Sequence, residues 1–456
     1  MGGVYQRGGS GVSQQNSRPS TTQVLAEANS LLESMRLRSA LGLLDSIGPE
    51  RERRAEILQL KAFILVQLGY FADAGAVLDQ ITGPGNNDEE YARLRVHVTL
   101  GLGDTVKAVS ESTALLRRYP SSVPGWCVHA DALAADGAGE AARGALLKAA
   151  EIGKTDLDVV NTALTIEDFD VARMVLDAHQ RMSPDALGHF LQALIELTVN
   201  GDSGACQTEL DAGRRLDADH PFGSFIAASL LVSRGDREAA IRAIDRALSE
   251  LDGPALRTIR GLLYQDEGRF DEALHEADFA LGHTPYSLEA LTLRAGLLAR
   301  RGAWSAVVRD ASRVLDKNPD HTEARILRAM AHLEQQRTEL ARRDAAAILA
   351  VNPHDGDALF LQAKISFAEG AYPQALKEIN EAIAVQGETV EKLLLRIWVQ
   401  VKMGGQHAAA VRDIKAILRI DPGNAMGLKL LNAEKEARAS QWGNLAKAIG
   451  RVFRGL

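Results

Sequence analysis

Three consecutive residues come closest to a chemical motif, but they lack its remaining parts. Gly153, Lys154 and Thr155 spell the end of a phosphate-binding loop, in which backbone N–H groups cradle a phosphate. That loop needs another glycine five residues before Gly153, where Lys148 stands, and a strand should precede it. We interpret the match as chance.

Histidines and carboxylates could hold a metal or move protons, but here they are scattered singly. His129 and His332 fall in helical segments without an HExxH pattern or a paired carboxylate at metal-ligand spacing. Asp271 and Glu272 open a predicted helix, where negative charge complements the helix dipole. The sequence therefore predicts no catalytic residue, no cofactor and no metal site, and hence a protein that is not an enzyme.

The cysteines and the charges exclude further classes. Cys127 and Cys206 lie far apart and form no CxxC, so they favour buried small-residue positions over a disulfide or a zinc site. The formal net charge is −8, and charges of both signs are interspersed. A nucleic-acid partner is not expected, because phosphate binding requires clustered lysine and arginine.

The elements that would position any site follow a 34-residue period. Pro285, Pro319 and Pro353 recur at that step in a strongly helical context. They end the matching phrases GRFDEALHEADFALGHTP, GAWSAVVRDASRVLDKNP and QRTELARRDAAAILAVNP. The pattern resembles the tetratricopeptide repeat (TPR) family, whose unit is a helix hairpin of 34 residues.

With the proline placed at position 32, units begin near residues 21, 55, 89, 123, 153, 187, 221, 254, 288, 322, 356 and 391. Their twentieth residue is small, being Ala40, Ala74, Ala108, Ala142, Ala172, Cys206, Ala240, Ala273, Val307, Ala341, Ala375 and Ala410. The eighth is often small too, as in Ala62, Ala130, Ala228, Gly261, Ala295, Ala329 and Ala363. Glycine stands fifteenth, where the first helix must stop, at Gly69, Gly103, Gly137, Gly201, Gly235, Gly268, Gly302, Gly370 and Gly405.

The resemblance implies an all-α fold: a right-handed superhelical α-solenoid of about twelve TPR-like hairpins with a C-terminal capping helix. Residues 1–20 form a Gly/Ser-rich tail without a signal-peptide core, so we expect a flexible segment. Residues 21–152 hold the N-terminal units, 153–186 a shortened irregular unit that could bend the array, and 187–423 the C-terminal units. Residues 424–456 hold the cap and a basic amphipathic helix.

In the family, positions 2, 5, 9, 12 and 13 of the first helix face the concave groove. Carried over, they predict partner-binding residues at Leu191, Ile195, Phe222, Phe225, Ile326, Met330, Phe360, Lys364 and Phe367. Such apolar patches bind peptides, yet a register shift of one residue would turn these side chains into the interhelix seam. Lys392 and Arg396 are a fragment of the family's clamp for carboxylate ends, whose other polar residues are missing.

The last segment could act in three ways. Trp442, Leu445, Ile449, Val452, Phe453 and Leu456 share one helical face, opposite Lys447, Arg451 and Arg454. Residues 424–456 hold six basic and two acidic side chains. Such a helix could close the last repeat, lie on an anionic membrane or bind a partner protein.

The sequence thus favours a non-enzymatic adaptor that holds protein or peptide partners on a concave surface. From the tail and the composition we expect a bacterial, cytoplasmic protein. No run reaches the roughly 18 apolar residues of a membrane span. The alternative is a peripheral membrane-associated assembly factor of an envelope complex for secretion, pili or polysaccharide export. An accessory subunit of an enzyme is a third hypothesis.

Overall fold

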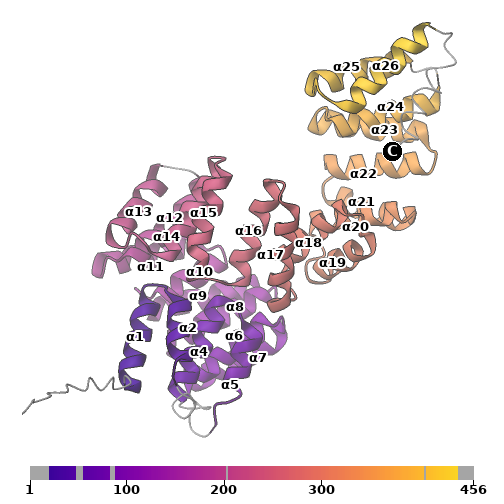
Figure 1. The fold of residues 1–456 in the computed structure, drawn as a ribbon. Helices are drawn as coiled ribbons and strands as arrows, with labels where there is room; N and C mark the ends of the chain where they lie inside the picture. The colour runs from indigo at the N-terminus through magenta and orange to yellow at the C-terminus, as the bar shows by residue number, and fades with distance from the viewer. Residues whose placement is uncertain (1–19, 48–54, 83–87, 202–203, 405–406, 440–456) are drawn as a thin grey trace, which may run out of the picture. The chain divides into compact units, whose positions relative to one another are not determined.

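The computed structural model of the chain describes residues 20–47, 55–82, 88–201, 204–404 and 407–439 (Figure 1). Helices joined by short turns make up this part of the chain, and it contains no strand. The predicted all-α solenoid class is therefore confirmed. The handedness of the superhelix, the exact number of repeats and the domain boundaries drawn from the sequence stay predictions.

The helices fall into two compact units. Unit 1 comprises the chain up to Glu267 together with Gly282–Pro285, and unit 2 comprises Gly268–Leu281 and the chain from Tyr286 onward. The first helices of the hairpins in unit 1 are α1 (Thr21–Glu33), α4 (Ala55–Leu68), α6 (Glu89–Gly101), α8 (Val123–Ala135), α10 (Leu157–Thr165), α12 (Ala186–Asn200), α14 (Pro221–Ser233) and α16 (Pro254–Asp266). The second helices are α2 (Leu37–Asp45), α5 (Phe71–Leu78), α7 (Thr105–Arg118), α9 (Gly139–Ile152), α11 (Phe169–Met182), α13 (Gly204–Leu216) and α15 (Arg237–Leu248).

In unit 2 the helices continue the same alternation. The first helices are α18 (Leu288–Arg300), α20 (Thr322–Glu334), α22 (Gly356–Ala368), α24 (Val390–Met403) and α26 (Ala425–Ala439). The second helices are α17 (Phe270–His283, its last two residues counted with unit 1), α19 (Trp304–Lys317), α21 (Thr338–Val351), α23 (Tyr372–Gln386) and α25 (His407–Ile420). After the last hairpin, α26 packs as a further first helix, with Leu430 buried against α24 and α25.

Local sequence signals set the ends of the helices. The Ser122 hydroxyl accepts a hydrogen bond from the Gly125 N–H at 2.8 Å, and Asp355 does the same for Ala358 at 2.9 Å. First helices end at a left-handed residue, predicted to be glycine and confirmed, for example, at Gly69 with φ 84°. In the last unit this glycine is Gly404 and not the predicted Gly405, which lies outside the described residues. Three units lack that glycine, and there Met35, Glu167 and Gln336 adopt the same positive φ.

The predicted close approach of the two helices is confirmed in hairpins that lie within one unit. Ala62, Ala130, Ala295 and Ala329 at position 8 are fully buried, as is Ala240 at position 20. The side chains are small because the helix backbones pack against each other there, so a larger residue would overpack the contact. Both free cysteines are also buried, as expected.

Unit 1 also joins its beginning to its end. The loop after α15 contacts the start of α2 and the turn between α4 and α5, more than 180 residues earlier in sequence. Ser39 donates from Oγ to Glu250 Oε1 at 2.7 Å and from its backbone N–H to Oε2 at 3.0 Å. Tyr70 Oη donates to the Asp252 carbonyl at 2.8 Å, and Leu251 packs on the same apolar cluster as α1 and α2. We call this contact the clasp.

Candidate binding surfaces on the first helices

Unit 2 brings its predicted groove residues together. Ile326 and Met330 on α20 are half-buried, as are Phe360, Lys364 and Phe367 on α22. The Lys364 ammonium lies 4.5 Å from the centre of the Phe360 ring, a cation–π geometry.

A residue that was not predicted extends this surface onto the next first helix. The Trp398 ring on α24 lies 5.9 Å from the Phe367 ring, in an edge-to-face arrangement. The centre of the Tyr372 ring lies 5.7 Å from the centre of the Phe367 ring. We call Ile326, Met330, Phe360, Lys364, Phe367 and Trp398 the aromatic wall.

The predicted groove residues of unit 1 divide into two pairs. Phe222 and Phe225 on α14 are half-buried, with ring centres 5.7 Å apart. Leu191 and Ile195 on α12 are 2% and 0% exposed and belong to the core around α8, α10 and α11. These two side chains lie in the interhelix seam and offer no surface to a partner.

A one-residue difference in register explains the burial of Leu191 and Ile195. The cap of α12 is Asp185, so its helix begins at residue 186 and not at the predicted 187. Leu191 and Ile195 then stand at positions 6 and 10, which are also buried in α6 at Leu94 and Val98.

The clamp fragment is occupied within the chain. Lys392 is 4% exposed and donates from Nζ to Gln386 Oε1 at 2.7 Å. Arg396 donates to both carboxylate oxygens of Asp413, at 2.8 and 2.7 Å, and to Asn380 Oδ1 at 3.1 Å. Neither side chain is presented for a ligand's carboxylate.

Arg396 is one rung of a repeated arrangement that we call the arginine ladder. Arg294 binds Asp310 through two hydrogen bonds, and Arg328 binds Asp344 in the same way. Each arginine also reaches back to the preceding second helix, at Asp278 and Ser312 respectively. A signal existed in the sequence, because arginine recurs at residues 260, 294 and 328 in step with the repeat.

The first three hairpins enclose a hollow that sequence reasoning did not single out. Its volume is about 470 Å³, and we call it the inner hollow. It is lined by Leu25, Asn29, Leu32, Glu56, Gln59, Leu60, Phe63, Glu90 and Arg93, from α1, α4 and α6. All but Leu60 stand at the family's groove positions. Applying those positions to units one to three would therefore have predicted the inner hollow from the sequence.

Titratable side chains lie next to the inner hollow, on the first helices α6, α8 and α10. Burial raises the pKa of Asp131 to about 7, against a hydrogen bond from Thr162 and with further help from the charge of Asp158. Burial, aided by the nearby Arg93 charge, lowers the pKa of His97 to about 3. The wall therefore holds a neutral imidazole and carboxylates of unequal acidity at neutral pH.

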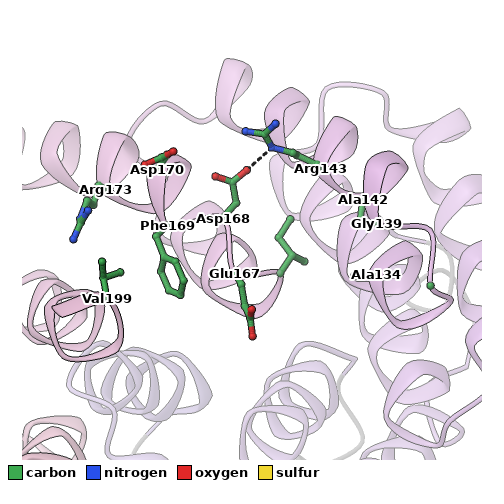
Figure 2. A pocket seen from close by; sticks show the side chains of 12 residues that line it. Ala134, Gly139, Ala142, Arg143, Glu167, Asp168, Phe169, Asp170, Arg173 and Val199 are labelled. Carbon is green, nitrogen blue, oxygen red and sulfur yellow. Dashed lines mark hydrogen bonds and ion pairs between the residues drawn. The ribbon is translucent and has the colours of Figure 1, made fainter. Parts of the chain in front are cut away.

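A second hollow, of about 650 Å³, lies at the turns of hairpins four to six (Figure 2). Its first helix α10 has 9 residues where α8 has 13, which makes α10 about 6 Å shorter. The side chains of Phe169 and Val199 line it, and Arg143 pairs with Asp168 at 2.7 Å across its upper side (Figure 2). Arg173, the other cation that lines it, pairs with Glu196 at 3.3 Å.

Two further searches concern the described residues alone. They contain no cluster of three or more His, Cys, Asp or Glu side chains placed to hold a metal. Nor does any helix in that part of the chain have the length and apolarity to cross a membrane. The predicted terminal helix, with Trp442, Leu445, Lys447, Ile449, Arg451, Phe453 and Arg454, lies outside the described residues.

A family model for the tetratricopeptide repeat matches residues 308–347 and 326–389, which include α20 to α22 and most of the aromatic wall. This part of the chain therefore consists of tetratricopeptide repeats, and we call the chain a TPR protein on that basis. Repeats of this family are in general protein-interaction modules, with extended concave binding surfaces. No protein of curated function matches this TPR protein in sequence.

Solved structures resemble the TPR protein at low identity. The APC/C hetero-tetramer Cut9-Hcn1 matches with 14% identity and a TM-score of 0.46, over 82% of this chain and 89% of that one. A tetratricopeptide repeat protein from Parabacteroides merdae matches with 21% identity and a TM-score of 0.41, over 51% and 92%. YrrB, a TPR protein with an unusual peptide-binding site, gives 20% identity and a TM-score of 0.34, over 40% and 95%.

Proposed function

We propose that this TPR protein is a non-enzymatic scaffold that holds segments of partner proteins on the concave faces of its two units. The observation that carries the proposal is the aromatic wall. Phe360, Phe367 and Trp398 gather on neighbouring first helices. Counted from the observed starts of α22 at Gly356 and of α24 at Val390, they stand at positions 5, 12 and 9, where the family places its ligands. Aromatic side chains that are half-buried in the free protein can be covered by a partner and then act as binding anchors.

The aromatic wall is also held in place by its surroundings. The arginine ladder joins α18, α20 and α24 to the second helices on both sides, so α20 and α24, the first helices next to α22, have little freedom to move. A surface whose geometry is fixed before binding loses less conformational entropy when a partner arrives. Lys364 adds a cation beside the rings, which favours a segment with an acidic or carbonyl group there.

Unit 1 supports the same function through Phe222 and Phe225. Their neighbouring rings are half-buried on α14 and supply an apolar contact of the kind that the aromatic wall supplies in unit 2. We therefore propose at least one partner segment for each unit.

The proposal is tested by recovering partners of the full-length chain from its native cells and identifying them by mass spectrometry. The double variant Phe222→Glu with Phe360→Glu should lose these partners, because two carboxylates would have to be buried in apolar contacts. Met174→Glu with Val385→Glu is the matched control, since both side chains are exposed on second helices. Circular dichroism melting curves verify that both variants fold. Retention of every partner by the groove variant would refute the proposal.

A peripheral membrane role is the second candidate, favoured by the local excess of four positive charges in residues 424–456. Basic amphipathic segments bind anionic lipid through both charge and apolar burial. Flotation with phosphatidylserine-containing liposomes should recover the full-length chain but not a truncation after residue 438. Absence of binding by the full-length chain would remove this candidate.

A further inference from the structure

The inner hollow has an apolar floor. Leu25, Leu32, Leu60 and Phe63 line it and are all half-buried, so they pack against the fold on one side and face the hollow on the other. A volume of about 470 Å³ has room for one or two large apolar side chains but not for a folded domain. The floor therefore suits apolar side chains of an extended segment.

The polar residues around the floor carry net negative charge. Glu56 is exposed, and the side chain of Glu90 is 42% exposed. Arg93 is the one cation among the nine residues that line the hollow, and its side chain is 12% exposed. It donates three hydrogen bonds to the Glu90 carboxylate and lies 5.6 Å from the centre of the Phe63 ring. The cation is thus held inside the wall, while Glu56 and part of Glu90 face outward.

The acidic character continues along the first helices next to the hollow. Asp158 on α10 is exposed, and Asp131 on α8 has one carboxylate oxygen, Oδ1, that is buried without a hydrogen-bond partner. The charge of Asp158 acts on Asp131, and that of Arg93 acts on Asp158, so the three side chains lie near one another. A cation placed between Asp131 and Asp158 would relieve their mutual repulsion.

We propose that the inner hollow and this acidic wall bind a partner segment in which lysine or arginine stands next to apolar residues. The inference rests on the scaffold function proposed above and assigns a partner chemistry to unit 1. An acidic segment would be repelled by Glu56, Glu90 and Asp158, and Arg93 is already engaged. A segment without charge would fill the hollow but leave the carboxylates unmatched. First helices of neighbouring repeats lie about 8–10 Å apart, so a segment crossing from α4 to α10 spans about nine extended residues.

The test uses the full-length chain and three fluorescein-labelled peptides of about nine residues. One alternates lysine with leucine, one replaces each lysine by glutamate, and one replaces each leucine by serine. Fluorescence anisotropy should show the lysine–leucine peptide binding about tenfold more tightly than either of the others, with affinity falling as salt increases.

Variants of the residues in and next to the inner hollow show where the peptide binds. Glu56→Gln with Asp158→Asn should weaken the lysine–leucine peptide about three- to tenfold, because two exposed charge pairs are lost. Glu140→Gln with Asp177→Asn makes the same change of charge at exposed positions of the second helices α9 and α11, and should change nothing. Asn29→Trp places a large ring at an exposed edge of the hollow and should block the peptide without removing a buried group.

Each result decides for or against the inference. Equal binding of the glutamate–leucine peptide, no binding of the lysine–leucine peptide, or equal losses in the wall variant and its control would each overturn it. If cellular partners still depend on Phe222 and Phe360 while the lysine–leucine peptide does not bind, the scaffold function stands and this inference alone fails.

Discussion

Units 1 and 2 fix their repeats by different means, although the same position of the first helix is involved. In unit 2 the seventh residue is an arginine that binds both the preceding and the following second helix, as Arg294 does through Asp278 and Asp310. In unit 1 the seventh residue pairs with the preceding second helix, as Lys61 does with Asp45 and Arg95 with Asp79, both at 2.6 Å. Sixteen residues after Lys61 stands Val77, whose side chain has no hydrogen-bond acceptor.

The difference teaches that a solenoid can be held either repeat by repeat or by contacts across many repeats. The arginine ladder acts locally and is buried, since Asp310 is 0% exposed. Unit 1 relies on exposed carboxylates within its repeats, and on the clasp between residues 38–70 and 249–254. We expect unit 2 to lose stability when one rung is cut, and unit 1 when the clasp is opened.

Cutting one rung should give the largest effect. Asp310→Ala removes the carboxylate that accepts two hydrogen bonds from the Arg294 guanidinium in a partly buried site. Unit 2 should therefore lose about 3 kcal/mol of stability. Asp79→Ala in unit 1 removes the partner of Arg95 but should cost less than about 1 kcal/mol, because Asp79 is 68% exposed. Urea denaturation followed by circular dichroism measures both. Equal losses would contradict the contrast between the two units.

The pH dependence of unit 1 should be next in size. The folded pKa of Asp131 is raised to about 7, so the folded state binds the proton more strongly, and stability falls as pH rises from about 4 to 7. His97 acts with the opposite sign, because its folded pKa near 3 makes stability fall as pH drops below about 6.5. Asp131→Asn should therefore remove the loss of stability toward pH 8. We expect a gain of about 2 kcal/mol, about half the full value of the shift, because the side chain is only half-buried and solvent screens it.

Hydrogen exchange of the α8 amides at pH 5 and pH 8 reports this gain within unit 1. Asp177→Asn, at an exposed position of α11, is the control and should show no pH-dependent gain. An unchanged pH dependence in Asp131→Asn would show that this carboxyl titrates as an ordinary one.

Opening the clasp should have an intermediate effect. A Cβ at residue 253 would lie 2.1 Å from the backbone oxygen of Leu68, so Gly253→Ala must move the loop away from α4. We expect a loss of about 1–2 kcal/mol in unit 1, and faster hydrogen exchange at the amides of Arg38 and Ser39, which bond to Glu250. Gly144→Ala has open space around its Cβ and should leave these amides unchanged.

The sequence reveals those parts of the fold that depend on neighbours within one repeat. Glycine at position 15, alanine at positions 8 and 20 and the polar caps are local requirements, so they recur with the period and could be predicted. The start of α12 was wrong by one residue because the adjoining turns differ in length and the period does not record such differences. Because of that error, Leu191 and Ile195 were predicted to face the groove.

Features that join distant residues left no comparable trace. The clasp pairs Ser39 with Glu250, and no sequence pattern near either residue predicts this contact. The inner hollow was missed for a different reason, because its polar residues lack the apolar pattern that drew attention to Phe222 and Phe360. Its one cation, Arg93, is largely covered in the structure, but in the sequence it has the pattern of an ordinary surface residue.

The smallest expected effect concerns the hairpin of unit 2 in which the ladder is interrupted. Gln362 stands at the period of the ladder arginines, and sixteen residues later Glu378 is 5% exposed with Oε2 lacking a hydrogen-bond partner. Gln362→Arg should supply that partner and stabilise unit 2 by about 1 kcal/mol, the lower end of the cost of an unsatisfied buried polar group. Gln362→Met offers a similar stem without the guanidinium and should give no gain. Urea denaturation of both variants distinguishes an added rung from better packing. If Gln362→Met stabilised unit 2 as much as Gln362→Arg, the gain would come from packing of the aliphatic part of the side chain and not from the guanidinium.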